Sequence, residues 1–352
     1  MAVASNFLIA ANDEHGLNPP TVGKRTPIMP YIDRSFYENE VNRQCKLRFL
    51  AALSRCGFNV YDVKPEIVDV PVSERVRRVN RARPDALLTF GYNAYGNGTT
   101  FNNIRGFCVF YSPQSRFPSN SRLLSLDVSD GLASLLDGRN LFTAPLNDVG
   151  VLESVSCPSC LVESGFMTNF NEAKQMLNPI FCEKVGEGSC IGVCDYFDVP
   201  YVAINAPKRT LRRYNRGNEV KYLQYLLILS GYDVTPDGIF GLNTQNAVLA
   251  FQNDVGITAD GVVGRVTWDY LTRNLSTYPT LRRGSRGAYV TLLQSLLTTF
   301  LYPLGSIDGV FGTNTERAVR EFQQENSLVV DGIVGANTWR ALVSSNGRPM
   351  PT

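Results

Sequence analysis

Cysteine spacing offers one candidate for metal chemistry in this 352-residue chain. Cys157-x-x-Cys160 together with Cys190-x-x-x-Cys194 supplies four thiols, the ligand number of a structural zinc site. Two other interpretations stay open. Cys160 lies in an apolar, strand-like run, where a small buried side chain is the ordinary explanation. A disulfide would form if the protein works outside the cell, and reduced thiols are otherwise the default.

Glu163 and His15 are candidates for acid–base or ligand chemistry. Glu163 follows directly on an apolar strand-like run, where an unpaired carboxylate would be costly to bury. That cost favours a functional or ancestral role for Glu163. His15 is the only histidine of the chain and lies in a turn, where a histidine is usually a polar surface residue.

The first two hundred residues must position these groups, and they alternate strand-like and helix-like patterns. This alternation predicts a largely parallel sheet covered by helices. The expected strands cover residues 7–11, 59–63, 86–90, 106–111 and 159–162. The expected helices cover residues 40–56, 73–83, 123–136 and 171–185.

Several short motifs in this half match one known enzyme family. Residues 161–169 read L-V-E-S-G-F-M-T-N, against the family pattern L-V-E-x-G-F-x-x-N. Residues 12–16 read N-D-E-H-G at the family's D-P-G-H-G turn, and residues 38–42 read E-N-E-V-N at its E-x-x-x-N helix start. The second strand at 57–60 and the stretch over 73–80 match as well. Residues 5–200 thus resemble the zinc-dependent N-acetylmuramoyl-L-alanine amidases of the amidase-3 family.

The resemblance implies a defined chemistry. Such enzymes hold Zn²⁺ with two histidines and one glutamate, and the metal acidifies a water and polarises the scissile carbonyl. A second glutamate acts as general base and then as acid. The bond cut joins the lactyl group of N-acetylmuramic acid to L-alanine. By motif position, His15 and Glu38 are metal ligands and Glu163 is the general base, although Glu38 also fits a solvated charge at a helix start.

One ligand position of this pattern is changed. The family's second histidine lies in S-I-H-A-N-A, and residues 89–94 here read T-F-G-Y-N-A, so that Gly91 stands at its place. Losing even an outer-shell partner costs a metal site about 10–100-fold in affinity, and losing a direct ligand should cost more. We therefore expect doubtful zinc occupancy. Groups that could substitute are Tyr92, Asn93, Asp13, Glu14 or a cysteine such as Cys108.

Two segments near the C-terminus repeat each other 71 positions apart. D-G-I-F-G at 237–241 recurs as D-G-V-F-G at 308–312, and T-W at 267–268 recurs at 338–339. L-R-R at 211–213 recurs at 281–283, 70 positions later, because one residue is inserted in between. Each copy predicts three short helices joined by glycine turns. Asn243 or Thr244, and later Thr267, are the expected caps.

The repeat resembles the peptidoglycan-binding-domain-1 family over about residues 210–343. The resemblance implies two three-helix modules that dock on bacterial cell wall. Most of the repeated residues are turn glycines and core side chains. We therefore expect the wall contacts, unassigned by sequence, to lie near Asp237, Gly238, Asp308 and Gly309.

Composition limits the partners and the compartment. The net charge of +2 argues against a dedicated nucleic-acid binder, and no stretch is apolar enough to span a membrane. Five arginines between residues 75 and 83 are expected to form a solvated helix face. Residues 1–13 do not resemble a signal peptide. Delivery to the wall would then follow cytoplasmic synthesis, through lysis, a phage or injection device, or a sporulating cell.

These patterns predict an α/β amidase-3-like domain over 1–201, an exposed linker over 202–209, modules over 210–275 and 280–343, and a tail over 344–352. Three interpretations follow. The leading one is a peptidoglycan-binding protein with a catalytically degenerate amidase domain, a pseudoenzyme. The second is an active zinc amidase such as a phage endolysin or a sporulation lysin. The third is a structural component of a phage-like, injection or spore assembly.

Overall fold

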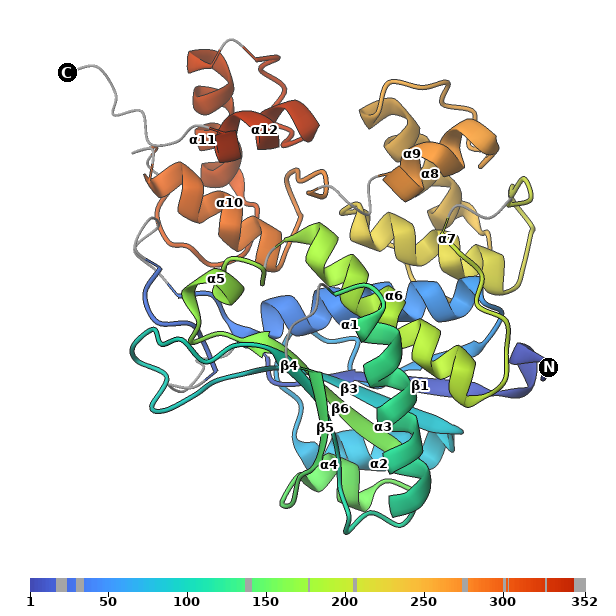
Figure 1. Cartoon of the computed structure of the whole chain (residues 1–352). Coiled ribbons are helices and arrows are strands. Elements are labelled where there is room, and N and C mark those ends of the chain that lie inside the picture. Colours follow the sequence, from blue (N-terminus) through green and yellow to red (C-terminus); the bar gives the residue numbers. More distant parts are fainter. Residues whose placement is uncertain are drawn as a thin grey trace.

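A six-stranded mixed sheet forms the centre of the N-terminal domain in the computed structural model (Figure 1). The structure describes residues 1–16, 24–29, 35–136, 141–176, 178–204, 208–273, 278–299, 302, 304–326 and 328–344. The strands are β1 Leu8–Asp13, β2 Asn59–Asp62, β3 Ala86–Asn93, β4 Phe107–Tyr111, β5 Leu141–Pro145 and β6 Ser159–Phe166. Their order is β2-β1-β3-β6-β4-β5, and β4 and β5 run opposite to the other four. The predicted largely parallel α/β sheet is confirmed.

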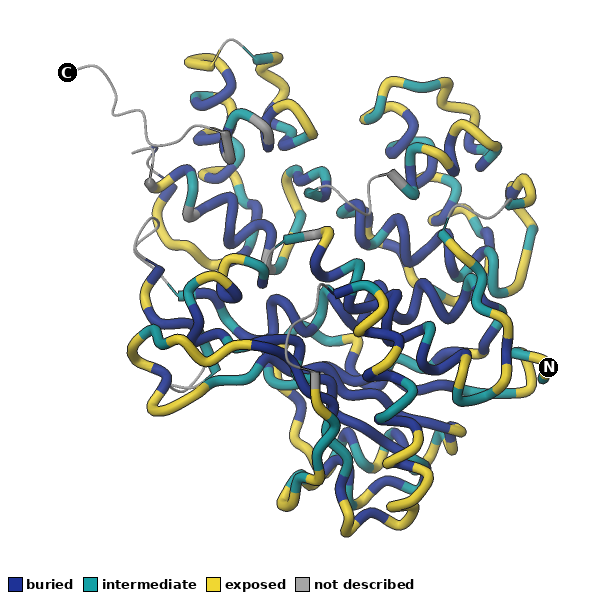
Figure 2. The backbone as a smooth tube through the Cα atoms, in the orientation of Figure 1, coloured by how far each residue is buried: buried dark blue, intermediate teal, exposed yellow. Residues whose placement is uncertain are grey.

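Helices cover both faces of this sheet because successive strand residues point to opposite sides. Ile9 packs with the core under α1 Glu38–Arg55, α3 Pro118–Ala133 and α6 Pro179–Tyr196, whereas Ala10 packs with the smaller core under α2 Val72–Ala82 and α4 Gly150–Ser154. Figure 2 shows the central strands β1, β3 and β6 and the helix α1 mostly buried. The short helices η1 Ala4–Asn6 and α5 Phe170–Ala173 complete the domain.

One predicted helix is wrong. The pattern over 171–185 suggested a single helix, but the chain forms α5 and then begins α6 at Pro179. Proline lacks an N–H and favours the first turn of a helix, where that donor is not needed. Asn178 caps α6 by accepting a hydrogen bond from the backbone N–H of Ile180. Strand β5 and helix α4 were not predicted.

The repeated C-terminal segments each form three helices, as expected. The first copy contains α7 Asn218–Leu229, α8 Leu242–Asp254 and α9 Arg265–Arg273. The second contains α10 Ala288–Thr299, α11 Thr313–Glu325 and α12 Ala336–Ser344. We call these the first and second module.

A glutamine clamps each Asp-Gly turn, and this clamp occurs four times. In the first, Gln224 Nε2 donates to Asp237 Oδ1 (2.8 Å) and Thr244 Oγ1 (3.0 Å), and Gln224 Oε1 accepts from Gly238 N (2.8 Å). The other three sets are Gln252–Asp260–Gly261–Thr267, Gln294–Asp308–Gly309–Thr315 and Gln323–Asp331–Gly332–Thr338. Each module is therefore itself a double repeat.

The clamps correct the predicted helix caps. Gly241, not Asn243 or Thr244, is the cap of α8, and Thr244 is buried within the helix. Thr267 likewise lies inside α9 and binds Gln252. The threonines are repeated because the clamp needs a hydroxyl, not because the helix needs a cap.

The first module packs against α1 of the sheet domain (Figure 1). Asn218 Nδ2 donates to the carbonyls of Gly57 (2.7 Å) and Phe58 (3.1 Å), directly after α1. Arg55 Nε donates to the Val202 carbonyl (2.7 Å), and its guanidinium lies over the ring of Tyr222. The start of the expected exposed linker is thus bonded to the sheet domain. Residues 205–207 and 345–352 lie outside the described part, so the predicted linker and tail remain predictions, as do the other domain boundaries.

Candidate active site

The turn after β1 carries the candidate ligands Glu14 and His15, and hydrogen bonds from Asn39 hold its backbone in place. Asn39 Nδ2 donates to Asp13 Oδ2 (2.7 Å) and to the carbonyls of Glu14 (3.3 Å) and His15 (3.0 Å). His15 has a left-handed backbone, with φ 58°, which these bonds stabilise. The buried Asp13 binds the ammonium group of Lys46 at 2.5 Å. Together these contacts fix the backbone positions from which the Glu14 and His15 side chains extend.

Glu38 opens α1 and is buried, with only 4% of its surface exposed. Its Oε1 accepts hydrogen bonds from Asn42 Nδ2 (3.0 Å) and from the backbone N–H of Tyr92 (3.1 Å). Its Oε2 lies 3.5 Å from His15 Nε2. Because one oxygen is fixed and the other faces the imidazole, Glu38 is not a solvated helix-start charge.

Glu14 joins these two residues. The ligand atoms of Glu14, His15 and Glu38 all lie within 4.8 Å of one another, and Glu14 Oε2 is 3.9 Å from His15 Nε2. In the family pattern D-P-G-H-G this position is the glycine before the histidine. From the sequence, Glu14 was only one of several possible substitutes for the missing ligand. Its position next to the only histidine of the chain was the signal that could have singled it out.

Gly91 lies between two carboxylates. It pairs with Glu163 on β6, while on its other side the Glu14 N–H donates to the carbonyl of Phe90 (3.0 Å). A Cβ at Gly91 would lie 2.9 Å from Glu163 Oε2 and 3.0 Å from Glu14 Oε2. Side chains from the two neighbouring strands therefore occupy the space in which a residue-91 side chain would begin.

The cluster concentrates negative charge away from water. Burial raises the pKa of Glu14 to about 7, and burial together with the charge of Glu14 raises the pKa of Glu38 to about 8. Burial and the same two carboxylates raise the pKa of Glu163, whose Oε2 has no hydrogen-bond partner in the described structure. Burial and the positive charge of Lys24 lower the pKa of His15 to about 4. The imidazole is therefore neutral near pH 7 and able to act as a ligand.

These residues fit a divalent cation. One imidazole nitrogen and two carboxylate oxygens supply the three protein ligands usual in catalytic zinc sites, and such donors also suit other divalent transition metals. A bound cation would remove the repulsion that now favours protonated carboxyls. Glu163, whose Oε2 has no hydrogen-bond partner among the described residues, lies next to Gly91 beside this set.

Family comparison decides the identity of this domain. The family model described as N-acetylmuramoyl-L-alanine amidase matches residues 18–195, and a putative peptidoglycan binding domain matches residues 216–271 and 286–342. The chain belongs to the N-acetylmuramoyl-L-alanine amidase family. The amidase match begins after His15, so the change at Glu14 lies just outside it.

Curated relatives match only parts of the chain. A probable N-acetylmuramoyl-L-alanine amidase of Bacillus licheniformis is 32% identical over 157 residues, which cover 38% of this chain and 44% of the relative. An N-acetylmuramoyl-L-alanine amidase of Mycobacterium tuberculosis is 33% identical over 121 residues, or 31% and 29% of the two chains. A spore cortex-lytic enzyme of Bacillus cereus is 43% identical over 65 residues, or 18% and 25%. The chain spans less than half the length of these relatives.

The solved structures that resemble the chain include an N-acetylmuramoyl-L-alanine amidase from Clostridium difficile. It is 23% identical, with a TM-score of 0.48, and covers 55% of this chain and 97% of its own.

Of the other groups named as substitutes in the amidase-family domain, Tyr92, Asn93 and Asp13 are engaged elsewhere, and Cys108 is a buried thiol beside Glu163. The Tyr92 hydroxyl donates to the Glu172 carbonyl (2.9 Å), and Asn93 Oδ1 accepts from the Ala94 N–H (2.8 Å). Asp13 is held by Lys46 and Lys64. Cys108 is buried beside Glu163 on β4, and burial raises the pKa of its thiol. Among the described residues, Glu14 is the substitute that reaches the ligands.

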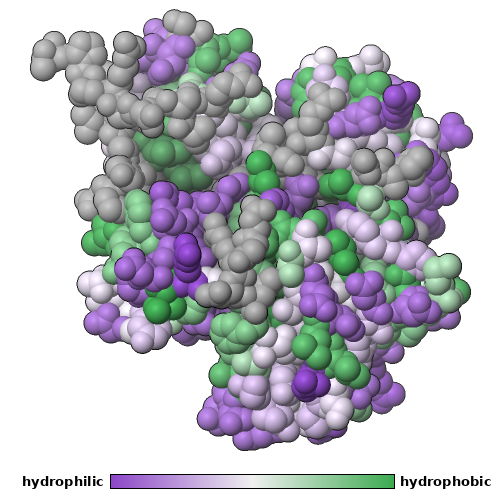
Figure 3. All heavy atoms as spheres, in the orientation of Figure 1, coloured by the Kyte–Doolittle hydropathy of each residue, from purple (hydrophilic) through white to green (hydrophobic). Residues whose placement is uncertain are grey.

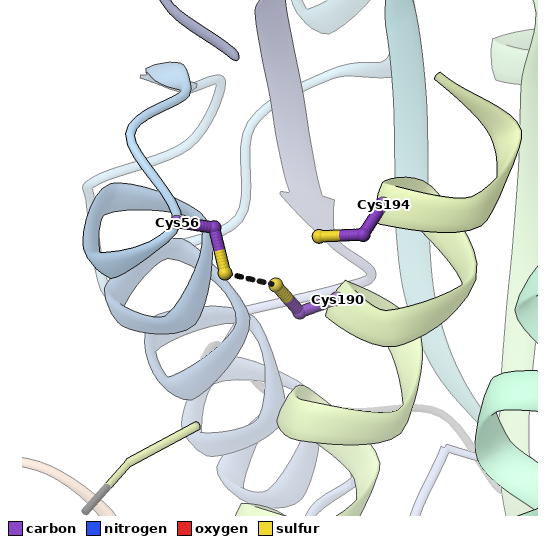
Figure 4. A group of neighbouring side chains, drawn as sticks. All are labelled: Cys56, Cys190 and Cys194. Carbon is purple, nitrogen blue, oxygen red and sulfur yellow. Dashed lines mark hydrogen bonds between the residues drawn. The ribbon is translucent and has the colours of Figure 1, made fainter. Parts of the chain in front are cut away.

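The four-thiolate zinc site that the cysteine spacing allowed does not form, and the alternative of a small buried side chain at Cys160 is confirmed. Cys157 packs on the α2 side of the sheet, and Cys190 and Cys194 pack on the α1 side. Figure 4 shows Cys56, from the end of α1, facing these two residues of α6. The Cys56 and Cys190 sulfurs are 3.7 Å apart, and all eight cysteines are free and buried. The packing of α1 against α6 decides which cysteines lie close together, and the spacing of cysteines in the sequence does not report that packing.

The expected solvated arginine face is only partly correct. Arg75 is buried and donates to the carbonyls of Asp13 (2.8 Å) and Val70 (2.7 Å), so it supports the turn under the candidate ligands. Arg77 and Arg78 do lie nearer the surface and pair with Glu74 along the helix.

Proposed function

We propose that this protein is a peptidoglycan amidase that holds a divalent cation with His15, Glu38 and Glu14. The observation that carries the proposal is the approach of these three ligand atoms to within 4.8 Å of one another. The expectation of a degenerate site counted His15 and Glu38 alone. With Glu14 included, the number of ligands equals that of working catalytic sites. When bound, the cation would supply an acidified water and polarise the amide carbonyl.

Glu163 is the proposed general base. Its buried carboxyl has a raised pKa, which makes it an effective proton acceptor near neutral pH once the cluster is neutralised. Glu163 would take a proton from the attacking water and return it to the amino group of L-alanine as the amide bond breaks. Asn42 and the Tyr92 N–H would hold Glu38 in place during these steps.

The two modules would bring this site to its polymer. Binding at two linked positions raises the effective concentration of the hydrolytic domain at the wall without any new contact to the scissile bond. The B. cereus relative is named a spore cortex-lytic enzyme, which is consistent with a wall substrate. Peptidoglycan is therefore the proposed partner.

A wall-binding pseudoenzyme is the second candidate, favoured by Gly91. Zinc content and the release of new L-alanine amino groups from purified walls separate the two proposals. We expect near-stoichiometric zinc and measurable release, and Glu163→Gln should reduce release by at least about 100-fold while retaining the metal. Glu321→Gln in the second module is the control. Wall binding with neither zinc nor release would favour the pseudoenzyme.

A further inference from the structure

A cleft of about 530 Å³ lies where the amidase domain and both modules meet. Asn39 and Arg43 of α1 form one wall, Tyr232 of the first module forms another, and the turn with Arg282, Arg283 and Arg286 of the second module closes it. Neither family match by itself contains this cleft, because three parts of the chain build it.

The cleft is positively charged. Its lining contains four arginines against two carboxylates, those of Glu40 and Asp233. Arginine presents a planar fork of N–H donors that matches carboxylate and phosphate groups in a bidentate manner. The lining therefore favours an anionic ligand.

Two of the arginines are fixed and two are available. Arg282 donates to Asp254 Oδ2 (2.6 Å) and lies over the ring of Tyr232, while Arg43 donates to the Pro65 carbonyl (2.9 Å). Arg283 and Arg286 are exposed and make no side-chain hydrogen bond or ion pair with any described residue. Their guanidinium groups can meet a ligand without breaking a hydrogen bond or ion pair between described residues, although the charge of Arg286 contributes to lowering the pKa of the nearby Asp308.

The cleft borders the candidate active site. Asn39, in its wall, is the residue that holds the backbone of Glu14 and His15, and Glu38 directly precedes it on α1. None of Glu14, His15, Glu38 and Glu163 lines the cleft, so Asn39 is the residue that the cleft shares with the supports of the candidate site.

We propose that Arg283 and Arg286 in this cleft bind carboxylates of the peptidoglycan peptide and align it with the amidase site. The inference rests on the proposed function. It favours the peptide because the scissile amide joins that peptide to the glycan. Phosphate polymers of the cell wall share the anionic chemistry, and the experiment below distinguishes them.

The internal repeat provides a matched control. Arg213 and Arg216 of the first module occupy the same repeat positions, 70 residues earlier, but do not line the cleft. Arg213 instead lies over the ring of Tyr214, 5.0 Å from its centroid. Replacing either pair removes the same two charges from the same kind of turn.

The test measures binding of soluble muropeptides, released from walls by a muramidase, to the full chain in chelator so that no cleavage occurs. Arg283→Ala/Arg286→Ala should weaken binding about 5–10-fold and reduce its salt dependence, as expected for two partly exposed charge-assisted contacts. Arg213→Ala/Arg216→Ala should change it less than about twofold. Equal losses in both variants, or no loss in the cleft variant, would overturn the inference.

Two further ligands identify the chemistry. Muropeptides whose carboxylates are converted to carboxamides should bind the wild-type chain as weakly as unmodified ones bind the cleft variant, and undiminished binding would contradict the carboxylate assignment. Teichoic acid tests the phosphate source: a cleft variant that loses teichoic acid but not muropeptide would overturn the peptide assignment. Muropeptide binding that depends on the cleft, without any amide release by the wild type, would refute the amidase proposal and leave the cleft in place.

Discussion

Relative to the family pattern, a glycine and a side chain able to bind a metal have exchanged positions between β3 and the turn after β1. Gly91 stands where the pattern has histidine, and Glu14 stands where it has glycine. The contact distances explain why the exchange is self-consistent: a side chain at 91 would begin 3.0 Å from the Glu14 carboxylate. Gly91 leaves room for the Glu14 carboxylate, and Glu14 supplies a carboxylate close to the place where the pattern's histidine is missing. Because motif matching treats positions one at a time, it records the missing histidine at position 91 but cannot choose Glu14 from the other possible substitutes.

The clustered carboxyls predict an unusual pH dependence of stability in the metal-free chain. The pKa of Glu14 is raised to about 7 and that of Glu38 to about 8, from an ordinary 4.5, so their protonated forms stabilise the fold and this stability is lost as pH rises toward those values. The pKa of His15 is lowered to about 4, which adds stability between about pH 4 and 6.5 and opposes the loss there.

Above pH 6.5 His15 adds no further stability, so only the loss that comes from Glu14 and Glu38 remains. We expect the free energy of unfolding to fall by about 2 kcal/mol between pH 6.5 and 8, as followed by urea denaturation in chelator. Zinc should abolish the fall because the cation replaces the protons, and Glu38→Gln should flatten the profile. A metal-free chain that becomes more stable over this range would refute the assignment of charges.

At the scale of elements, the glutamine clamps explain the repeated Asp-Gly turns. Asp237 and Asp308 each bind a glutamine through Oδ1, and that oxygen also accepts the backbone N–H two residues on. These side chains therefore have a structural role. The predicted location of wall contacts near these turns is untested, and exposed neighbours of the turns are better candidates than the clamped aspartates.

Gln323→Ala in α11 should destabilise the second module by about 2–3 kcal/mol, because the clamp partners Asp331, Gly332 N–H and Thr338 lose hydrogen bonds in a buried turn. The adjacent Gln324 is exposed, and Gln324→Ala should change stability by less than about 0.5 kcal/mol. Thermal unfolding of both variants compares them directly. Similar melting temperatures for the two would show that the clamp contributes little.

Sequence patterns predicted the elements better than the contacts between them. Period and glycine turns located five of the six described sheet strands, all but β5, and the six described module helices, since those signals are local. The split at Pro179 was missed because the apolar pattern continues across it. The meeting of Cys56 with Cys190 depends on how α1 packs on α6, 134 positions away. Glu14 beside Gly91 likewise required the register of β1 against β3.

At the scale of the whole molecule, the modules are attached to the enzyme-family domain and do not extend away from it (Figure 1). Hydrophilic and hydrophobic residues are interspersed over the face seen in Figure 3. No helix within the described residues is long and apolar enough to cross a membrane.

Attachment to the wall should be independent of the metal. The full chain in chelator, and the Glu163→Gln variant, should both sediment with purified walls to the same extent as the untreated wild type, because His15, Glu38 and Glu163 belong to the sheet domain and not to the modules. The measurement is the fraction of protein in the pellet across salt concentrations. Loss of sedimentation on chelation would mean that the cation site, not the modules, carries the affinity.

The most direct test of the account is zinc binding by calorimetry to the wild type, Glu14→Gly and the double exchange Glu14→Gly/Gly91→His. Removing one direct ligand should weaken zinc binding by more than about 100-fold, and returning a histidine at position 91 should recover most of the loss. The account predicts one tightly bound zinc in the wild type, loss in Glu14→Gly and recovery in the double exchange. Unchanged zinc affinity in Glu14→Gly would contradict it.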